Sequence, residues 1–340
     1  MVSIRGYIST NFTKSFMTIF LPFFFIIALV YLVKISALTA QIQISFGELL
    51  QLFSYSVPDI IFYTLPLSFI AALANTLLRL STDNELIALY ALGMNAGKIL
   101  RGIWLIALLF SLLLLTISFL AMPMSKQLYK SFKDEKKAEA KLNIVPGKLG
   151  QKFGDFYVYV KKKEKNGLFH DLVIYNRTDM ANEQFFAAKQ GKMNKTNGQT
   201  SLLLYNGFGY TYSKDHLQQA EYRTLEAFDT AKKQRFHFED IVDYWKKAAS
   251  DRHIMHRLFF FLYVSLIPLL ALYLVAAFAM INPRYQSNHA FTVIFGTTLL
   301  LYLTASSLEK WGNPLLLAAA IVLTLSAGYL LFQRRVARYF

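Results

Sequence analysis

The order of apolar and polar positions divides this chain into three parts. Two flanks are almost entirely apolar, and the segment between them, residues 125–257, is polar and rich in lysine. Each flank contains three apolar runs, and each run is long enough to cross a hydrocarbon core of about 30 Å as a helix. The pattern predicts three membrane helices, an inserted domain and three more membrane helices, with the six apolar runs at residues 15–33, 60–78, 102–124, 258–283, 290–308 and 314–332.

The polar middle segment changes character at Pro146-Gly147. Before this pair, residues 126–141 are charged and predict a helix that extends the third membrane helix outward; the pair then breaks it. After it, short aromatic and β-branched runs alternate with Asn-Gly pairs, which are typical of turns. The pattern predicts an all-β domain of the sandwich or jelly-roll type. Its expected strands lie at 156–160, 172–175, 184–187, 201–205 and 208–212, with turns at 166–167, 197–198 and 206–207.

The basic charge follows the membrane pattern. The chain has 17% charged residues and a net charge of +15, whereas soluble domains carry about 25% charged residues. Lys34 and Lys310 occupy the short loops on one side, and nine basic residues fall on the other, which argues against a nucleic-acid partner and for the positive-inside rule. Both termini are therefore expected in the cytoplasm. The nine are Arg5, Lys14, Arg79, Lys98, Arg101, Arg284, Arg334, Arg335 and Arg338.

Enzyme chemistry has no recognisable signature in this sequence. The chain has no cysteine, so disulfides and thiolate ligands are excluded. The segment 93–99 resembles a phosphate loop, but it is one residue short between its glycines and has Ile99 where magnesium binding needs Ser or Thr. No spacing of serine, histidine and carboxylates suggests a catalytic site, and neither a metal nor a cofactor is expected.

The short cytoplasmic loop between the second and third runs predicts a small amphipathic helix. Ser81 can cap it, and Glu85 then lies in its first turn, near the positive end of the helix dipole. Leu86 and Leu89 fall on one side at helical spacing, and Gly93 can end the helix. A helix of this size suits insertion into a groove of a cytoplasmic partner. A surface helix that lies on lipid headgroups is the alternative.

Lys34 is the only charged residue between Lys14 and Glu48. It lies at the outer end of the first predicted helix. Its ammonium group can reach the membrane interface along its aliphatic stem, or it can contact an anionic headgroup. Both interpretations remain open from the residues themselves.

Several short motifs occur here in a specific order and spacing. They are Val57-Pro58-Asp59, Leu65-Pro66-Leu67-Ser68, Arg79-Leu80-Ser81 with Glu85, Leu86, Ala88, Ala91 and Gly93, Ala138-Glu139-Ala140-Lys141, and Asn282-Pro283-Arg284. Together with the three-plus-three plan, they resemble the LptF/LptG permeases of lipopolysaccharide export along essentially the whole chain. The first, fourth and fifth motifs look more like the F member than the G member.

The resemblance implies a transporter in the inner membrane of a Gram-negative bacterium. In that family an F and a G subunit pair, and a dimer of a separate ATPase binds ATP beneath them, so the permease itself needs no cofactor. Lipopolysaccharide enters through a lateral gate between helix one of one subunit and helix five of the other; helix five here is 290–308. The lipid then passes to a periplasmic bridge built of like β-domains.

The resemblance also assigns roles to residues. Glu85 is expected to contact the ATPase, within a coupling helix at about 81–93 that includes Ser81, Leu86, Leu89 and Gly93. Lys34 is expected to contact lipid phosphate. Alternation in the first long strand puts Tyr157 and Tyr159 on one face and Val158 on the other. One of the two faces is expected to line an apolar groove for acyl chains, and the two tyrosines are the candidate lipid-binding residues.

Two other functions compete with lipopolysaccharide transport. A mechanotransmission-type ABC permease would couple ATPase strokes to an external domain without moving lipid, but such proteins typically use four helices. A membrane-tethered binding or scaffold protein would not need a capped helix in a cytoplasmic loop. The expected organisation is residues 1–124 with helices one to three, 125–257 as the periplasmic β domain, and 258–340 with helices four to six.

Overall fold

The chain folds into two compact units. The helical unit comprises Met1–Lys130 and Phe238–Phe340, and the β unit comprises Ser131–His237. The computed structural model describes residues 4–39, 44–142, 144–153, 156–164, 166–176, 182–196, 199–213, 216–228, 238–247, 250–281 and 289–338.

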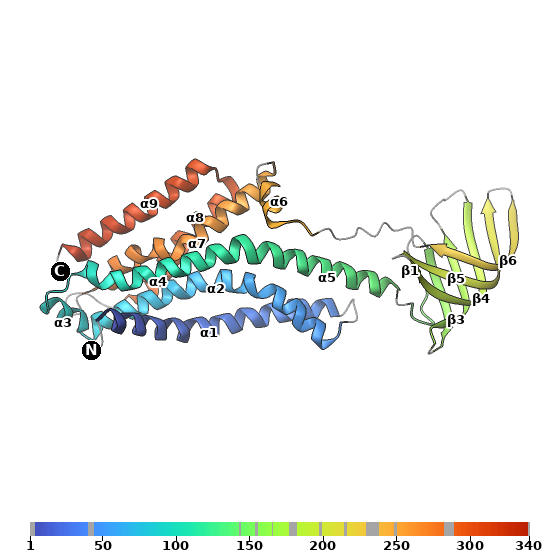
Figure 1. Cartoon of the computed structure of the whole chain (residues 1–340), viewed down its shortest axis with the longest axis horizontal. Helices are drawn as coiled ribbons and strands as arrows, with labels where there is room; N and C mark the ends of the chain where they lie inside the picture. The colour runs from blue at the N-terminus through green and yellow to red at the C-terminus, as the bar shows by residue number, and fades with distance from the viewer. Residues whose placement is uncertain are drawn as a thin grey trace. The chain divides into compact units, whose positions relative to one another are not determined.

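Six spans in the described ranges are long and apolar enough to cross a membrane, which confirms the predicted number. Two shorter helices, α3 (Glu85–Ala91) and α6 (Ile241–Lys246), lie between them (Figure 1). The spans are α1 (Ile4–Thr39), α2 (Phe46–Thr82), α4 (Ala96–Thr116) continued by η1 (Ile117–Ala121) and α5 (Met122–Leu142), α7 (Arg252–Ala279), α8 (Ala290–Trp311), and α9 (Pro314–Phe332) continued by η3 (Gln333–Ala337).

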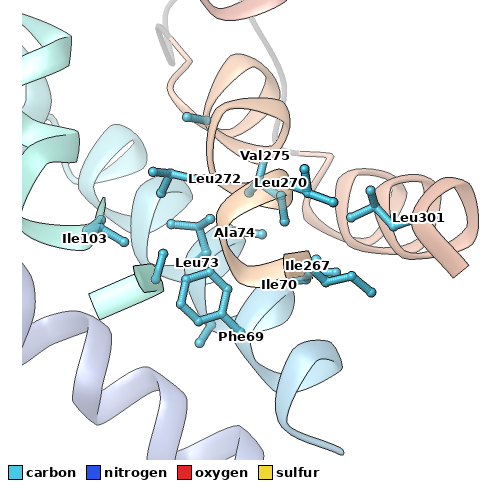
Figure 2. Close-up of a cluster of buried hydrophobic side chains, with 14 of the residues drawn as sticks. Phe69, Ile70, Leu73, Ala74, Ile103, Ile267, Leu270, Leu272, Val275 and Leu301 are labelled. Atoms are coloured by element: carbon cyan, nitrogen blue, oxygen red, sulfur yellow. The ribbon is translucent and has the colours of Figure 1, made fainter. Parts of the chain in front are cut away.

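Helices α2 and α7 form the centre of the helical unit. Figure 2 shows apolar side chains of both helices meeting there, among them Phe69 and Leu73 of α2 and Ile267 of α7. Small residues such as Ala74 and Ala271 are fully buried among them. Small side chains let membrane helices approach closely, so that van der Waals contact stabilises the pair where no hydrophobic effect acts between helices.

Helix α2 begins well before the apolar run that predicted it. Ser45 and Glu48 form a capping box: the Ser45 amide donates to Glu48 Oε2 at 2.8 Å, and the Glu48 amide donates to Ser45 Oγ at 3.4 Å. These reciprocal bonds satisfy two amides that have no partner inside the helix. The motif Val57-Pro58-Asp59 therefore lies inside α2 rather than before it.

The third membrane helix continues outward without a break into the charged segment. The prediction of a helical extension over 126–141 is confirmed by α5. Between the two parts lies the π-helical segment η1, which frees a carbonyl from the α-helical pattern. Trp245 of α6 donates its indole N–H to the Phe119 carbonyl at 2.9 Å, so α6 is held against η1.

The β unit contains one six-stranded antiparallel sheet, and each described strand pairs with its neighbours in sequence. The predicted all-β insertion between the two sets of helices is confirmed. Strands β1 and β6 were not predicted, because β1 is short and β6 carries polar residues on both faces. The strands are β1 (Gln151–Phe153), β2 (Phe156–Lys163), β3 (Leu168–Asn176), β4 (Asn182–Thr196), β5 (Gln199–Ser213) and β6 (Leu217–Phe228).

One predicted turn in the β unit is wrong. Asn206-Gly207 lies inside the continuous strand β5, and Asn206 has a φ of 51°. Asp171 of β3 has a φ of 52°, and each of the two residues occupies one unpaired position in a register that is the same before and after it. The Asn-Gly pair therefore interrupts the ladder at one position and makes neither a hairpin turn nor a shift of register. The turn at Asn166-Gly167 is confirmed, whereas 197–198 lies outside the described residues.

Glycine at position 207 makes room for a tyrosine that crosses the sheet. Tyr222 of β6 pairs with Gly207 of β5 and donates its hydroxyl to the Ala187 carbonyl of β4 at 3.0 Å. A Cβ atom at Gly207 would lie 2.6 Å from the Tyr222 hydroxyl and 2.1 Å from the Ala187 oxygen, so no larger residue fits. Burial raises the pKa of Tyr222 to about 12.

Candidate functional site

The loop between α2 and α4 carries the seven-residue helix α3. Asn84 precedes it in the left-handed conformation, with a φ of 60° and no side-chain capping bond. Gly93, with a φ of +81°, lies just beyond its end, where glycine is favoured. Figure 1 shows α3 at the same end of the helical unit as the start of α1 and the end of α9. This end is called the α3 end below.

The predicted capping role of Ser81 is wrong. Ser81 belongs to the last turn of α2 and is completely buried. Its hydroxyl lies 2.9 Å from the Leu77 carbonyl and 3.0 Å from the Ala279 carbonyl, and it accepts from the Ile281 amide at 3.2 Å. Carbonyls at a helix end lack partners within the helix. Ser81 therefore joins the end of α2 to the end of α7, and α3 begins four residues later than expected.

Helix α3 has an apolar side, but that side faces the protein itself. Leu86 is buried, and Leu89 and Tyr90 pack against the apolar cluster of the helical unit. The large apolar side chains left exposed are Ile87, with 38% exposure, and Leu92, just after the helix, with 74%. Sequence periodicity identified the apolar side correctly but could not tell that it serves to attach α3. Ile87 and Leu92 are the large apolar residues available to another molecule.

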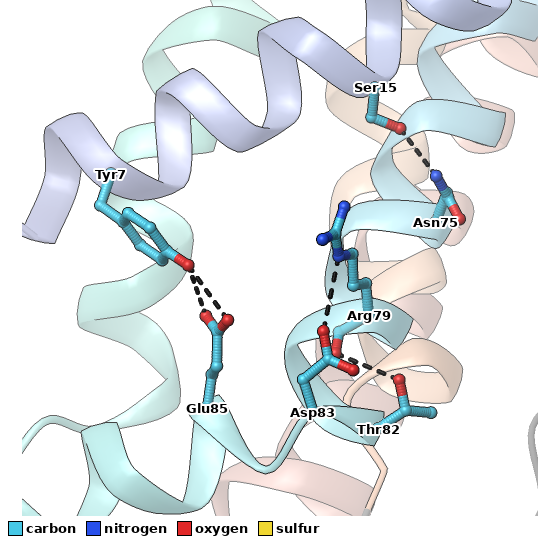
Figure 3. A network of polar contacts seen from close by, with 7 residues as sticks. All are labelled: Tyr7, Ser15, Asn75, Arg79, Thr82, Asp83 and Glu85. Carbon is cyan, nitrogen blue, oxygen red and sulfur yellow. Dashed lines mark hydrogen bonds and ion pairs between the residues drawn. The ribbon is translucent and has the colours of Figure 1, made fainter.

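Glu85 is held by Tyr7, a residue that no sequence pattern singles out. The hydroxyl of Tyr7, on α1, lies 3.0 and 2.9 Å from the two carboxylate oxygens of Glu85 (Figure 3). The neighbouring cation, Arg79, instead contacts Asp83 at 3.4 Å. Tyr7 and Glu85 are 78 positions apart, so no local pattern could have predicted this contact.

Lys34 lies near the opposite end of α1. Its side chain is exposed, and its ammonium nitrogen is 5.8 Å from the centroid of the Tyr31 ring. An ion pair joins two neighbouring helices: Lys126 of α5 lies 3.9 Å from Asp59 of α2. The positive charges of Lys34 and Arg257 also interact electrostatically with the Asp59 carboxylate. This end of the helical unit thus gathers three cations around one carboxylate.

Several membrane spans expose apolar faces, among them α4, α9 and the two helices expected at the gate, α1 and α8. On α1, the exposed side chains include Phe25 and Leu29, with 64% and 62% exposure. On α8, Phe291 is 80% exposed, and Phe295 and Leu303 are also exposed. A helix whose apolar face is not covered by its own chain is covered either by lipid or by another membrane helix.

Tyr157 and Tyr159 lie on the face of β2 opposite its buried residues. Val158 and Val160 are buried in the apolar cluster of the β unit, whereas Tyr157 is 41% exposed. The predicted alternation is confirmed. On the tyrosine face, Tyr157 lies 6.3 Å from Tyr175 between ring centroids. The two candidate lipid-binding tyrosines thus belong to an exposed aromatic face.

The described residues contain no group of three or more histidine, cysteine, aspartate or glutamate side chains that could hold a metal ion. The polar contacts at the α3 end join helices through side chains that carry no catalytic arrangement. Besides Tyr7 and Glu85, Asn75 of α2 donates to Ser15 Oγ of α1 at 3.0 Å. The geometry is that of a structural junction with an exposed surface.

Comparison with known proteins gives one clear result. No curated protein matches the chain. The family model described as lipopolysaccharide export system permease LptF/LptG matches residues 6–333, which is nearly the whole chain. This match agrees with the six membrane spans and the β unit inserted between the third and fourth of them. The chain therefore belongs to the LptF/LptG family of lipopolysaccharide export permeases.

Proposed function

We propose that this protein is one permease subunit of an ABC transporter that extracts lipopolysaccharide from the bacterial inner membrane and passes it to a periplasmic bridge. The observation that carries the proposal is the surface of α3. This helix and the residue after it hold a carboxylate, Glu85, and two exposed apolar side chains, Ile87 and Leu92, on a loop between two membrane spans. Family membership supplies the substrate class.

The protein is a multi-pass membrane protein of a transport family and not an enzyme. Hydrolysis of ATP is assigned to a separate cytoplasmic ATPase dimer, which binds the nucleotide, so this chain needs no cofactor. Glu85 can accept hydrogen bonds from a cationic side chain of that ATPase, while Ile87 and Leu92 enter an apolar pocket on it. Charge and apolar surface together give both orientation and affinity to such an interface.

The positive-inside rule supports the orientation that this docking requires. Arg79, Lys98 and Arg101 lie next to α3, and Arg334 and Arg335 lie in η3 at the end of α9. Basic residues beside membrane spans favour the cytoplasmic side. The α3 end with both termini is therefore assigned to the cytoplasm, and the β unit to the periplasm.

Lipid entry is assigned to the faces of α1 and α8 that the chain leaves uncovered. A paralogous permease of the same family would supply the facing helices, so that α1 of one subunit and α8 of the other form a gate. Lys34 is proposed to contact a phosphate of the entering lipid. Near a membrane surface, one basic residue contributes about 1 kcal/mol towards binding of anionic lipid.

The β unit is proposed to receive the lipid and to join the periplasmic bridge of like β-domains. The exposed aromatic face with Tyr157 and Tyr159 offers rings against which acyl chains can pack. The motifs at 57–59, 138–141 and 282–284 favour the F member of the family over the G member.

The test is purification from native membranes, with partners and bound lipid identified by mass spectrometry. Recovery of a related permease, an ATPase and lipopolysaccharide together supports the proposal. Recovery of the ATPase without lipid would instead indicate a mechanotransmission-type permease, and recovery of neither would indicate a membrane-tethered scaffold. The six spans argue against the mechanotransmission type, which typically has four.

A further inference from the structure

The two halves of α1 are attached very differently to the rest of the helical unit. In the half near the α3 end, Ile8, Phe12 and Phe16 are buried in the central apolar cluster. The ring centroid of Phe12 lies 5.2 Å from that of Phe69 on α2, and that of Phe16 lies 4.8 Å from that of Phe110 on α4. This half of α1 is packed against two other helices.

The other half of α1 is largely uncovered. Leu21, Phe25, Leu29 and Val33 are all exposed, and in the most apolar stretch of this span 11% of the residues are buried. Helix α1 runs without interruption from Ile4 to Thr39, and Pro22, which has no amide hydrogen to bond to the carbonyl four residues earlier, lies between its two halves. A displacement of the packed half is therefore carried to the exposed half through a continuous helix in which Pro22 is the point that bends most easily.

Tyr7 lies one residue before the first of these buried positions. Its hydroxyl donates to the Glu85 carboxylate, at 2.9 Å from one oxygen and 3.0 Å from the other. A hydrogen bond to an ionised group is stronger than one between neutral groups. A phenol also leaves the negative charge of Glu85 in place, so the carboxylate retains sites for a second, cationic donor. Figure 3 shows that this bond joins α1 directly to α3.

We propose that Tyr7 is a positioning residue for Glu85 and the polar link through which a displacement of α3 reaches α1. The inference rests on the proposed docking of the ATPase at α3. Tyr7 fixes the carboxylate for its partner, and in return it moves with α3 when the partner moves. Because the outer half of α1 is uncovered, the movement appears there.

The neighbouring contacts define what stays fixed. Ser81 joins the ends of α2 and α7 through a completely buried hydroxyl, and those two spans are each 72% buried in their most apolar stretch. By contrast, the Tyr7 side chain is 41% exposed. A buried, doubly bonded contact is costly to break, whereas a partly exposed one exchanges easily with water. In this proposal the pair α2–α7 is the frame, and α3 and α1, joined by the partly exposed contact between Tyr7 and Glu85, are the parts that move.

A distance measurement tests the link in the chain itself. Since the chain has no cysteine, spin labels can be attached at Thr10→Cys on α1 and Ala88→Cys on α3, both exposed positions. The parent chain in nanodiscs is expected to give a narrow distribution of label distances. Tyr7→Phe should broaden it, because the ring remains but the bond is lost. An unchanged distribution in Tyr7→Phe would overturn the inference.

The matched control is Tyr329→Phe. Its hydroxyl accepts a hydrogen bond from Gln333 at 2.6 Å within the same stretch of helix, so this variant loses the same group without separating two elements. The distance distribution between α1 and α3 should remain narrow. If Tyr329→Phe broadens it as much as Tyr7→Phe does, the effect is a general consequence of removing a phenol hydroxyl and the specific link is refuted.

A transport measurement distinguishes this inference from the function on which it rests. The complex with its ATPase is reconstituted in proteoliposomes, and lipopolysaccharide released per ATP hydrolysed is compared between variants. Tyr7→Phe is expected to retain the ATPase but to release about threefold to tenfold less lipid per ATP, the range expected for one lost hydrogen bond.

Glu85→Arg separates the possible failures. If this variant loses the ATPase while Tyr7→Phe releases lipid normally, docking at α3 stands and the role of Tyr7 is refuted. If Glu85→Arg binds the ATPase normally, docking at α3 is refuted, whatever Tyr7→Phe does. Reduced lipid release in Tyr7→Phe with normal recovery of the ATPase supports both the docking at α3 and the role of Tyr7.

Discussion

Helices α1 and α7 are almost equally apolar but are used in opposite ways. Their most apolar stretches have mean hydropathies of 2.6 and 2.5, yet 11% of the residues are buried in α1 and 72% in α7. Hydropathy tells whether a helix suits apolar surroundings. It does not distinguish the lipid bilayer from the core of a membrane protein, because the two are equally apolar. Helix α7 differs from α1 in its buried small and polar residues, such as Ala271 and Ser265. The comparison shows that hydropathy identifies a membrane helix but does not tell whether the chain itself covers that helix.

The largest effect is expected from truncating a buried leucine. Leu73 of α2 is completely buried, whereas Leu29 of α1 is 62% exposed. Leu73→Ala should lower the free energy of unfolding by about 2–3 kcal/mol, mainly through the cavity that it leaves. Leu29→Ala should cost less than about 0.5 kcal/mol. Unfolding in mixed detergent micelles measures the loss of stability in both variants. Equal losses would contradict the distinction between α2, in the frame, and the uncovered helix α1.

The second effect concerns the exposed loop helix. Glu85→Arg should lower recovery of the ATPase with the purified permease by at least about tenfold, because a like charge now faces a cationic partner. Asp83→Asn is the matched control, since the neighbouring carboxylate already contacts Arg79. Pull-down of the ATPase measures both. Equal recovery with Glu85→Arg and Asp83→Asn would exclude Glu85 as a docking residue.

The third effect sharpens the role of the exposed end of α1. Lys34→Asp should keep the protein in the membrane and bound to its partners but lower crosslinking to lipopolysaccharide about fivefold, as expected for about 1 kcal/mol. Lys34→Arg should be tolerated because it keeps the charge. Normal export by Lys34→Asp would make Lys34 an interface anchor that reaches the membrane surface.

The smallest effect lies in the β unit. Tyr222→Phe should lower the stability of this unit by about 1 kcal/mol, the contribution of one hydrogen bond, with faster amide exchange in β4. Because the folded pKa of Tyr222 is about 12, above the ordinary value for tyrosine of about 10, its contribution is complete below pH 10 and declines as the pH rises towards 12. Tyr157→Phe, on the exposed face, is the control; equal sensitivity of both variants to alkaline pH would contradict this assignment.

Periodicity and charge predicted the elements that depend on local sequence. The six apolar runs, the outward extension into α5 and the alternation of Tyr157 and Val158 all follow from neighbouring residues. The capping box at Ser45 and Glu48 could have been recognised too, since Ser followed by Glu at the third position is a helix start signal. This signal at Ser45 and Glu48 predicts the start of α2 at the position where the structure has it.

Contacts between distant segments were beyond sequence reasoning. Ser81 follows the rule for a helix cap, but tertiary packing extended α2 past it and buried its hydroxyl against α7. Asn206-Gly207 has the residues of a hairpin turn, yet β5 pairs with the strands on both sides in the same register before and after it, with one position left unpaired. Tyr7 carried no signal, because its role depends on a partner elsewhere in the chain.

The most direct test of the central claim is ATP-dependent release of lipopolysaccharide from proteoliposomes. The vesicles contain this permease with its paralogue and ATPase, and an acceptor β-domain protein is present outside. Release of lipopolysaccharide is expected to require ATP, to fall to background with Glu85→Arg, and to be unchanged with Asp83→Asn. ATP hydrolysis without lipid release by the intact complex, or release that persists with Glu85→Arg, would contradict this expectation.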